Sequence, residues 1–527
     1  MPTTDLPHPA IIIGAGVAGL TAALHLAERG VCPLVLEADA ERAGGRLRGN
    51  APVSLEHAGQ TWQFHQEHGV HGIWSPYRNF QAMLARHRIR PVLVPAQQEE
   101  WIHGDGSSVR RAEVGSAIRG SWIPAPFHYA GLFVRPRFLA MLGLHDILSL
   151  YVVLGGLLAA LSIDPLSEEK SLPGLTLADF CRGWPPKLTG FFDALTRNAL
   201  PASSREIPAS GFIAFLRFYT LRRRDAWAFS YLPDASGATI IDPLMATLEA
   251  LGAQIRLDSP VARLERSADG WRAIAPSGSI AAHHVVLATD APSTERLLRA
   301  SPDTCAQAEL LHLPAGRPTA IVRLWFDRLP ARPGAEAGIF SGDFILDNFF
   351  WLHRIYDEYV RWHRATGGSA IEAHIYGPPD LLRSSDASIL AQAIVDVGRA
   401  WPDLKGHVLH STLTRNEATH TLLHVGTAEE HLGVITPWAD LFCCGDWVRD
   451  PNPAMFLERA CVTGIKAANA VLGRLGREPW PVLPAPEAEP LARRVESAMS
   501  RIRQAERRRR AAANRRPSGG LPLSLNR

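Results

Sequence analysis

The pattern of apolar and polar positions at the start of the chain predicts a strand, a helix and a second strand. An apolar run, residues 10–13, has the length of a buried strand, and an alanine- and leucine-rich segment, Thr21 to Arg29, has the composition of a helix. A second apolar run, Cys32 to Leu36, ends on an acidic residue, Glu37. Such a unit is the building block of an open parallel sheet, so we expect an α/β fold.

The remaining chain divides into segments of different pattern. A helix is predicted around residues 79–87, and helical patterns rich in aromatic residues dominate residues 146–228. Four short strands, at 254–257, 260–264, 271–275 and 280–288, are expected to form a second sheet that returns to the first. Residues 318–327 and 370–376 are expected in a separate sheet, and an apolar strand starting at Leu441 leads into a long helix that ends near Leu472.

The segment between the first strand and its helix carries a glycine motif, Gly14-x-Gly16-x-x-Gly19. Gly14 permits a tight turn, Gly16 lets the backbone approach a pyrophosphate, and Gly19 allows close helix–strand packing. Glu37 lies 18 residues beyond Gly19, near the spacing of a carboxylate that binds a ribose. Since a helix N-terminus also offers free N–H groups to phosphates, the segment predicts a dinucleotide site.

Two further segments indicate which dinucleotide is bound. Arg42-Ala-Gly44-Gly45-Arg46 follows the ribose acid and resembles the second phosphate-contacting loop of the FAD-binding amine oxidase and phytoene desaturase superfamily. The segment Gly445-Asp446-Trp447 and the helix after it resemble the part of that superfamily which returns to the N-terminal sheet. The resemblance implies FAD as cofactor and assigns roles to further residues. These are Asp446 as ligand of the ribityl chain after Gly445, the backbone of Ala454, Met455 and Phe456 near the flavin ring, and the backbone of Val261 near the adenine.

This resemblance also implies a domain order: a Rossmann-like FAD-binding domain with an interleaved substrate domain made of a mixed sheet and a helical insertion. The expected divisions are FAD-binding parts at 1–78, 237–300 and 431–477, a helical region that faces substrate or membrane at 79–236, the substrate sheet at 301–430, and a Pro-rich linker with a basic tail at 478–527.

The segment from Glu67 to Trp74, which includes His68, Gly69 and His71, looks like the stretch over the flavin in plant-type carotenoid desaturases and carotene desaturase/methyltransferases. Segments at 348–354, 369–377 and 447–453 look like later parts of the same group. The implied reaction is desaturation of an apolar polyene or terpenoid by hydride transfer to flavin N5, with or without ring aromatisation. If a side chain acts as base, His71 is the first candidate and His68 the second, because a neutral imidazole works near pH 7. The alternative is that both histidines only hydrogen-bond the loop backbone.

Other functions stay open. A flavin amine oxidase usually carries a lysine near the flavin, and none of Lys170, Lys187, Lys405 and Lys466 matches that position. A non-redox polyene isomerase, or a flavin-binding partner without catalysis, would show the same motifs. Only one dinucleotide fingerprint is present, so we expect the organic substrate to reduce the flavin and a quinone, oxygen or another acceptor to reoxidise it.

Composition narrows the class further. The 527 residues are 46% hydrophobic, enough for a large core, and the six cysteines show no C-x-x-C spacing, which favours a reducing cytoplasm. No secretory signal is expected in the first residues. Neither a metal-binding histidine pair nor a G-x-S-x-G elbow is found, so we expect no metal and no serine hydrolase.

Charge is distributed unevenly. Residues 491–527 contain eleven arginines and two glutamates, a net charge of +9. The whole chain has a net charge of +3, so the other residues together have a net charge of −6. A helical run is predicted at 491–514. This run is either solvated or disordered, or it contacts the anionic inner face of a membrane. Nucleic acid is an unlikely partner because no aromatic residue is interleaved. Residues 147–163 lack charge but are too short to span a bilayer, so we expect a buried helix of the substrate domain, with a segment lying in the membrane surface as the alternative.

Overall fold

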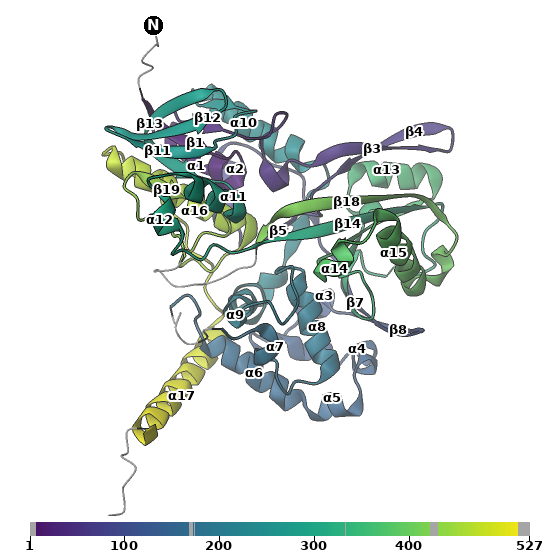
Figure 1. Ribbon diagram of the computed structural model, residues 1–527. Helices are drawn as coiled ribbons and strands as arrows, with labels where there is room; N and C mark the ends of the chain where they lie inside the picture. Colours follow the sequence, from purple (N-terminus) through teal and green to yellow (C-terminus); the bar gives the residue numbers. More distant parts are fainter. Residues whose placement is uncertain (1–6, 168–171, 173, 333, 422–430, 515–527) are drawn as a thin grey trace, which may run out of the picture.

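A computed structural model describes residues 7–167, 172, 174–332, 334–421 and 431–514. It has three regions: a sheet-and-helix region at the top of Figure 1, a second sheet beside it, and a helical region below. The domain divisions drawn from the sequence stay a prediction, but the elements within them can be compared one by one. Residues 422–430 and 515–527, which belong to the predicted substrate sheet and basic tail, lie outside the described part.

The first sheet is built around β1 (His8–Ile13), which pairs in parallel with β2 (Leu34–Leu36) and β13 (Gly278–Leu287). Its order is β10 (Gln254–Arg256), β2, β1, β13, β12 (Gly270–Ala275) and β11 (Arg263–Ser267). The last strand, β19 (Leu441–Cys443), pairs in parallel with the end of β13. The prediction of a second sheet at 254–288 was therefore wrong: these strands extend the first sheet on both sides, because β10 pairs with β2 and β13 with β1.

Two helices far apart in sequence pack together beside this sheet. They are α1 (Val17–Ala27) and α16 (Phe456–Arg474). Small residues permit the close approach, since a Cβ added at Gly464 would lie 2.6 Å from the Ala18 carbonyl oxygen. This contact brings the C-terminal segment against the glycine loop. The other helices of the region are α2 (Arg78–Arg86), α10 (Asp242–Ala250), α11 (Ala291–Ala300) and α12 (Cys305–Ala308).

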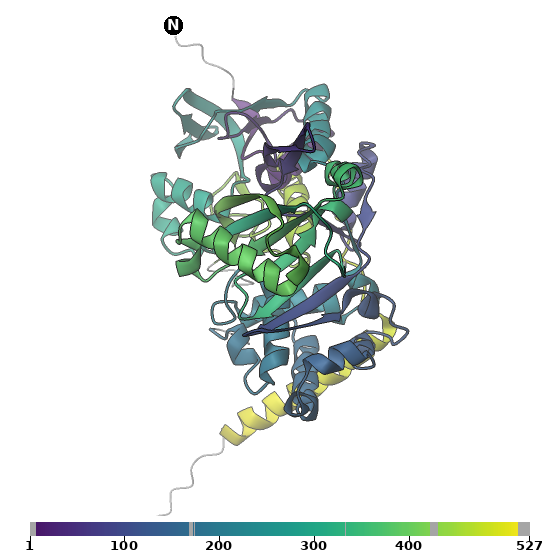
Figure 2. The ribbon, with the colours of Figure 1, turned by 90° about the vertical axis from the view of Figure 1, so that its right-hand side faces the viewer.

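The second sheet contains both strands predicted for it. Its order is β18 (Val408–Thr421), β14 (Gly316–Phe326), β17 (Ser369–Ile375), β16 (Asn348–Trp351), β15 (Ala337–Gly342), β7 (Glu99–Asp105) and β8 (Ser108–Glu113). Helices α13 (Asp357–Thr366), α14 (Pro379–Leu382) and α15 (Asp386–Ala400) accompany it, and α15 lies across its outer face in Figure 2. Smaller strands join the two regions: β3 (Asn50–His57) with β4 (Gln60–Gln66), and β5 (Gly72–Trp74) with β9 (Phe229–Tyr231) and β6 (Val94–Pro95).

The helical region follows the predicted pattern of residues 146–228. It contains α3 (Gly115–Arg119), α4 (Pro136–Met141), α5 (Leu144–Leu148), α6 (Leu150–Ser162), α7 (Leu177–Phe180), α8 (Pro186–Arg197) and α9 (Ala209–Leu216). A long helix, α17 (Pro490–Asn514), runs along it and extends away at the lower left of Figure 1.

The uncharged segment 147–163 is not the buried helix that we expected. Leu148 is 68% exposed and Tyr151 75% exposed, and Leu144 just before them is 74% exposed. Within α6 only Val153 and the last turn enter the core, where Ala160 and Leu161 are fully buried. No helix in the described part of the chain is both long and apolar enough to cross a membrane.

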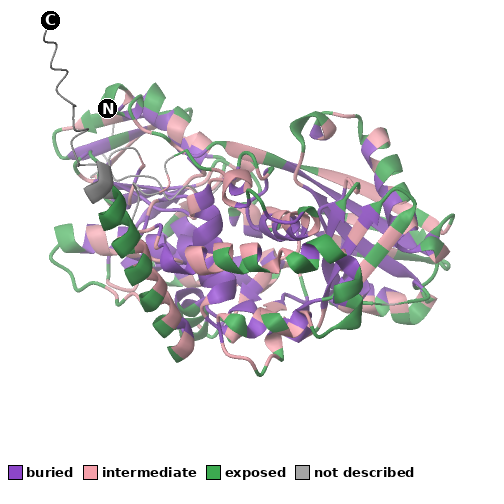
Figure 3. Ribbon diagram, turned by 90° about the horizontal axis from the view of Figure 1, so that it is seen from below, coloured by how far each residue is buried: buried purple, intermediate pink, exposed green. Residues whose placement is uncertain are grey.

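The helix predicted in the basic tail is confirmed, and it is docked on the protein rather than detached. Ser500 Oγ and Arg503 Nη2 both donate to the Ser162 carbonyl oxygen at 3.0 Å, and Arg217 Nη2 lies 2.6 Å from Glu496 Oε1. Figure 3 shows the rest of α17 as an exposed rod. The exposed apolar residues of α5 and α6 and the basic helix α17 therefore belong to one region of the molecule.

Candidate functional site: a dinucleotide cradle and an aromatic cavity

Each glycine of the first motif occupies the position that its predicted role requires. Gly14 has a φ of +105°, which only glycine adopts readily. A Cβ at Gly19 would lie 2.0 Å from the Gly14 carbonyl oxygen, so no side chain fits between helix and turn. A Cβ at Gly16, in contrast, would meet nothing within 4 Å. The predicted pyrophosphate position, over Gly16 at the N-terminus of α1, is therefore open space.

The second glycine loop lies directly against the first. Gly44 N–H donates to the Ala15 carbonyl oxygen at 2.8 Å, and a Cβ at Gly45 would approach Gly16 Cα to 3.3 Å. The structure thus brings together two phosphate-binding segments that the sequence placed in series. Arg42 is exposed, and its backbone N–H donates to Asp39 Oδ1 at 3.0 Å.

Glu37 stands at the end of β2, beside the glycine turn. Its Oε2 accepts from Ala15 N–H at 2.7 Å and its Oε1 from Asp39 N–H at 3.0 Å. Burial raises the pKa of the Glu37 carboxyl, although these backbone donors oppose the change. Ser259 N–H donates to the Glu37 carbonyl oxygen at 2.8 Å, which places the partly buried Val261 two residues from this edge.

The first and last segments of the predicted FAD site meet through an ion pair. Arg46 Nη2 lies 2.5 Å from Asp446 Oδ2, although the two residues are 400 positions apart. Gly445, with a φ of +155°, donates from its N–H to Thr463 Oγ1 on α16 at 3.0 Å. This pair connects the second glycine loop with the C-terminal segment.

The turn that precedes α16 is held by buried side chains. Arg459 donates from Nε to the Ala454 carbonyl oxygen at 2.7 Å and from Nη2 to the Asn452 carbonyl oxygen at 2.9 Å. Ala454 and Met455 are buried, and Phe456, the first residue of the helix, has a φ of +55°. A non-glycine residue in that conformation persists only where its surroundings enforce it. The open helix N-terminus is thereby directed at the site.

The loop from Glu67 to Trp74 carries the two histidines predicted as candidate bases. Burial favours the neutral form of Glu67, but His71, with Nε2 at 3.5 Å, and Ser236, which donates from its N–H and Oγ, lower the pKa of the carboxyl. Burial, reinforced by Arg46, holds the pKa of His68 well below its usual range, so His68 is neutral. Neither His68 nor His71 is among the residues that line the cavity described next, whereas Val70 and Gly72 are.

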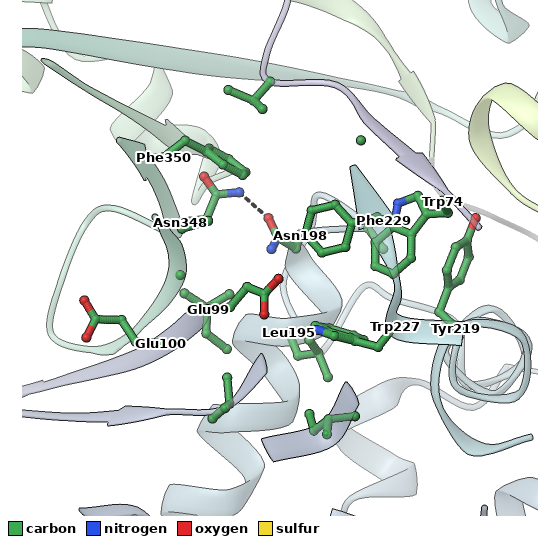
Figure 4. A pocket seen from close by; sticks show the side chains of 18 of the residues that line it. Trp74, Glu99, Glu100, Leu195, Asn198, Tyr219, Trp227, Phe229, Asn348 and Phe350 are labelled. Carbon is green, nitrogen blue, oxygen red and sulfur yellow. Dashed lines mark hydrogen bonds between the residues drawn. The ribbon is translucent and has the colours of Figure 1, made fainter. Parts of the chain in front are cut away.

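A cavity lies between the second sheet, the helical region and the start of α16. Figure 4 shows Trp74, Phe229 and Trp227 on one side and Asn348 and Phe350 on the other. Trp74 and Phe229 are stacked with centroids 4.6 Å apart. Most of the wall is aromatic or aliphatic, and its aromatic members are Trp74, Tyr129, Phe191, Phe215, Tyr219, Trp227, Phe229, Tyr231, Phe350, Tyr376 and Phe456.

A polar cluster on β17 and its neighbours was missed by our sequence reasoning as a functional element. Glu372 and His374 are buried, and Arg323, on β14, donates from Nε to Glu372 Oε2 at 2.7 Å. His374 Nε2 lies 2.7 Å from Glu372 Oε1, and His374 Nδ1 lies 2.8 Å from the hydroxyl of Tyr376. The signal was present, because residues two apart on a strand share one face.

Two carboxylates also reach the cavity wall. Glu99 forms an ion pair with Arg119, whose Nη1 lies 2.7 Å away. Glu100 is buried with Arg111 at 3.6 Å, and burial raises the pKa of its carboxyl to about 7. Both groups are thus compensated, by a cation or by protonation, in a wall that is otherwise apolar.

The structure also bears on metal and amine chemistry. In the described part of the chain one group, His65, Asp234 and Glu358, has possible ligand atoms within 4.8 Å of one another, brought together from three separate segments. Among the described residues no lysine lines the cavity, and Lys466, for example, pairs with Asp450 at 2.6 Å. Lys170 lies outside the described residues.

Comparisons with known proteins agree with this geometry. Solved structures with the same fold include a putrescine oxidase variant, with a TM-score of 0.64 and 12% identity over 89% of this chain and 100% of that one. The cyclohexylamine oxidase of Brevibacterium oxydans has a TM-score of 0.63 and 16% identity over 90% of this chain and 100% of that one. At these identities the likeness shows the fold alone.

A cradle of two glycine loops closed by a returning C-terminal segment defines a flavoprotein of the dinucleotide-binding class. The model of the flavin containing amine oxidoreductase family matches residues 17–472, and the chain belongs to this family. The protein is therefore an FAD-dependent oxidoreductase.

Its curated relatives act outside amine chemistry. A carotenoid phi-ring synthase of Streptomyces griseus is 30% identical over 90% of this chain and 89% of its own length. A carotenoid phi-ring synthase of Chlorobaculum tepidum is 24% identical over 91% of both chains. The 15-cis-phytoene desaturase of Capsicum annuum is 22% identical over 76% of this chain and 66% of its own length.

Proposed function

We propose that this protein desaturates a carotenoid and aromatises its end ring. The observation that carries the proposal is the cavity, which is lined by eleven aromatic side chains and shares Phe456 with the predicted flavin site. An apolar wall of this kind binds a hydrocarbon by excluding water. An amine cation would need a free anion, and the two carboxylates of the wall, Glu99 and Glu100, are compensated by an arginine and by protonation. Resemblance to the two carotenoid phi-ring synthases supports the same substrate class.

The residues of the chain have separable tasks in this reaction. FAD held in this cradle would supply a hydride acceptor for the substrate. Gly14, Gly16, Gly19, Gly44 and Gly45 are proposed to shape the phosphate cradle, with Glu37 at the ribose and the Arg46–Asp446 pair at the ribityl chain. Ala454 to Phe456 would face the ring with backbone groups, and Val261 the adenine.

The cavity has a further role, because removal of a hydride leaves positive charge on the polyene. Aromatic faces attract a cation within about 6 Å of their centroids. Trp74, Tyr219 and Trp227 form one such group, with ring centroids of Trp74 5.0 Å from Tyr219 and 5.6 Å from Trp227. These rings are proposed to hold the end ring in place and to stabilise its positive charge while hydrogen is lost and a methyl group moves.

The electron acceptor is proposed to be a quinone, oxygen or another small acceptor, since the chain carries one dinucleotide fingerprint. His71, and after it His68, stay predicted candidates for the base. His71 Nε2 lies 3.5 Å from Glu67 Oε2, and neither histidine is among the residues that line the cavity.

The experiment is an anaerobic titration of the purified holoprotein with carotenes, followed by absorption of flavin and polyene. Bleaching of the flavin together with a new polyene spectrum is the expected result. A polyene that changes while the flavin stays oxidised would indicate an isomerase instead. Bleaching by amines but not by carotenes would assign an amine oxidase, and a protein that does not bind FAD would refute the proposal.

A second proposal concerns how an apolar substrate reaches the cavity. Leu144, Leu148 and Tyr151 expose apolar surface beside the basic helix α17, and each basic residue near anionic headgroups contributes roughly 1 kcal/mol. We propose that α5, α6 and α17 rest on an anionic membrane surface. Flotation with vesicles containing anionic lipid should recover the protein, and the double variant Leu148→Ser and Tyr151→Ser should float less. Equal flotation of both proteins would contradict the proposal.

A further inference from the structure

In the polar cluster of β17, ionisable groups of the cavity wall form a continuous chain of hydrogen bonds that extends into the protein interior. The chain runs from Arg323 through Glu372 and His374 to Tyr376, which lines the cavity beside Asn348. Its far end is completely enclosed, since the side chains of Arg323 and Glu372 are each 1% exposed. It thus connects a buried ion pair with a hydroxyl at the substrate.

The direction of the hydrogen bonds follows from the charge of Glu372. Burial opposes ionisation of this carboxyl, but Arg323 and His374 outweigh it and lower the pKa of Glu372 to about 2. An ionised carboxylate only accepts hydrogen bonds, and it also accepts from Val70 N–H at 2.9 Å. His374 therefore carries a proton on Nε2, directed at Glu372, and in the neutral imidazole its Nδ1 accepts the hydroxyl proton of Tyr376.

Tyr376 is held from the other side as well. Asn348 donates from Nδ2 to the Tyr376 hydroxyl at 3.1 Å and also donates to Asn198. With its own proton directed to His374 and one lone pair engaged by Asn348, the oxygen keeps one lone pair for another donor. Tyr376 lines the cavity, so that lone pair is available to the substrate.

The cluster also supports the loop proposed to cover the flavin. Arg323 Nη2 donates to the Glu67 carbonyl oxygen at 2.7 Å, and a Cβ at Gly69 would lie 3.1 Å from His374 Cε1. The relay is therefore attached to the loop that the resemblance places over the flavin.

We propose that Tyr376 is the catalytic base of the desaturation and that His374 and Glu372 position and activate it. This inference rests on the proposed function. One substrate C–H bond breaks with its electron pair leaving as hydride to the flavin. The C–H bond of the neighbouring carbon breaks and its electron pair becomes the new π bond, while its proton passes to Tyr376 Oη. The hydroxyl proton of Tyr376 moves to His374 Nδ1, so that tyrosine stays neutral and an imidazolium forms beside the Glu372 carboxylate.

A weak base suffices in this position because the neighbouring carbon already bears positive charge. Removing a proton from a carbon next to a cation is far easier than removing it from a neutral hydrocarbon. The hydroxyl of a neutral tyrosine, coupled to an imidazole, is adequate for that task.

The test compares Tyr376→Phe with Tyr359→Phe in the holoenzyme. Tyr359 is buried, is not among the residues that line the cavity, and its hydroxyl has no hydrogen-bond partner among the described residues, so it is a matched control. Single-turnover reduction of the flavin by a carotene is measured without oxygen, with the substrate concentration varied to separate rate from affinity. Loss of a general base lowers the rate by about 10²- to 10⁴-fold. We expect that loss for Tyr376→Phe, with unchanged affinity and flavin spectrum, and little change for Tyr359→Phe.

A second measurement serves if Tyr376→Phe fails to bind FAD. The relay moves an exchangeable hydroxyl proton, so wild-type flavin reduction should be slower in D₂O than in H₂O. Absence of a solvent isotope effect, or equal rates for the two tyrosine variants, would overturn the assignment of Tyr376. If no carotene reduces the wild-type flavin at all, the proposed function fails and this inference with it.

Discussion

Replacement of Glu372 by glutamine tests the buried ion pair on which the polar cluster depends. Glu372→Gln leaves the Arg323 guanidinium enclosed without its counter-charge, while the shape of the side chain stays nearly the same. The pKa of Glu372 is lowered from 4.5 to about 2, a stabilisation of the charged form by about 3 kcal/mol at 1.36 kcal/mol per unit. Breaking a buried pair by removing one partner costs a similar 3–5 kcal/mol.

The assay is thermal unfolding of the holoprotein, followed by circular dichroism. At roughly 2.1 cal/mol/K per residue, a chain of 527 residues has an unfolding entropy near 1 kcal/mol/K, so the melting temperature should fall by about 3 °C. The control is Asp380→Asn, since Asp380 pairs with Arg383 at the surface with both side chains largely exposed. Exposed pairs contribute about 0–1 kcal/mol, and the control should therefore melt within about 1 °C of wild type.

The difference in stability between wild type and Glu372→Gln should depend on pH in a definite direction. A carboxyl whose pKa is depressed by folding stabilises the protein above its unfolded value of 4.5, and that contribution is lost as pH falls towards about 2. The difference in melting temperature between wild type and Glu372→Gln should therefore be constant from pH 7 to pH 6 and decrease below about pH 4.5. Equal melting of Glu372→Gln and Asp380→Asn at pH 7 would refute the reasoning.

Three further outcomes are expected. Gly19→Ala places a Cβ 2.0 Å from a backbone oxygen and should abolish stable folding, which circular dichroism would report. Gly16→Ala meets no atom within 4 Å and should give a folded protein without FAD, which flavin absorbance would report. FAD retained by Gly16→Ala would contradict the proposed phosphate cradle. Burial raises the pKa of Glu100 from 4.5 to about 7, so the free energy of unfolding should fall as pH rises from about 4.5 to 7. Glu100→Gln should remove this decrease, measured as melting temperature against pH. The same decrease in the variant would contradict the assignment to Glu100. Asp446→Ala removes the partner of Arg46 and should weaken FAD binding by about 1.5–3 kcal/mol in equilibrium dialysis, and unaltered affinity would separate the pair from the cofactor.

The parts of the fold that the sequence predicted are those set by local pattern. The strand at residues 10–13, the helix after it, the strand before Glu37 and the helix near residues 79–87 all form within a few residues of their predicted bounds. The helix predicted at 491–514 forms at Pro490–Asn514. Hydrophobic periodicity and glycine spacing act over short distances along the chain, so one sequence is enough to identify them.

Strand pairing and the burial of helices were predicted less well from the sequence. The strands from 254 to 288 were assigned to a sheet of their own, because no local signal states that β13 pairs with β1. The segment 147–163 was expected to be buried because it lacks charge, yet Leu148 and Tyr151 are exposed. An uncharged sequence shows only that a segment lacks charged residues. The packing of neighbouring helices decides which face of the helix is buried.

The sequence by itself determined the phosphate-binding chemistry of this protein, because glycine conformations and a helix N-terminus are local properties that the residues carry with them. Only the tertiary structure decided that Arg46 meets Asp446, that eleven aromatic rings enclose one cavity, and that Arg323 and Glu372 connect through His374 to Tyr376. The physical reason is that hydrogen bonds and ion pairs depend on distances in space. Residues 400 positions apart become neighbours only when the sheets and helices that carry them have packed.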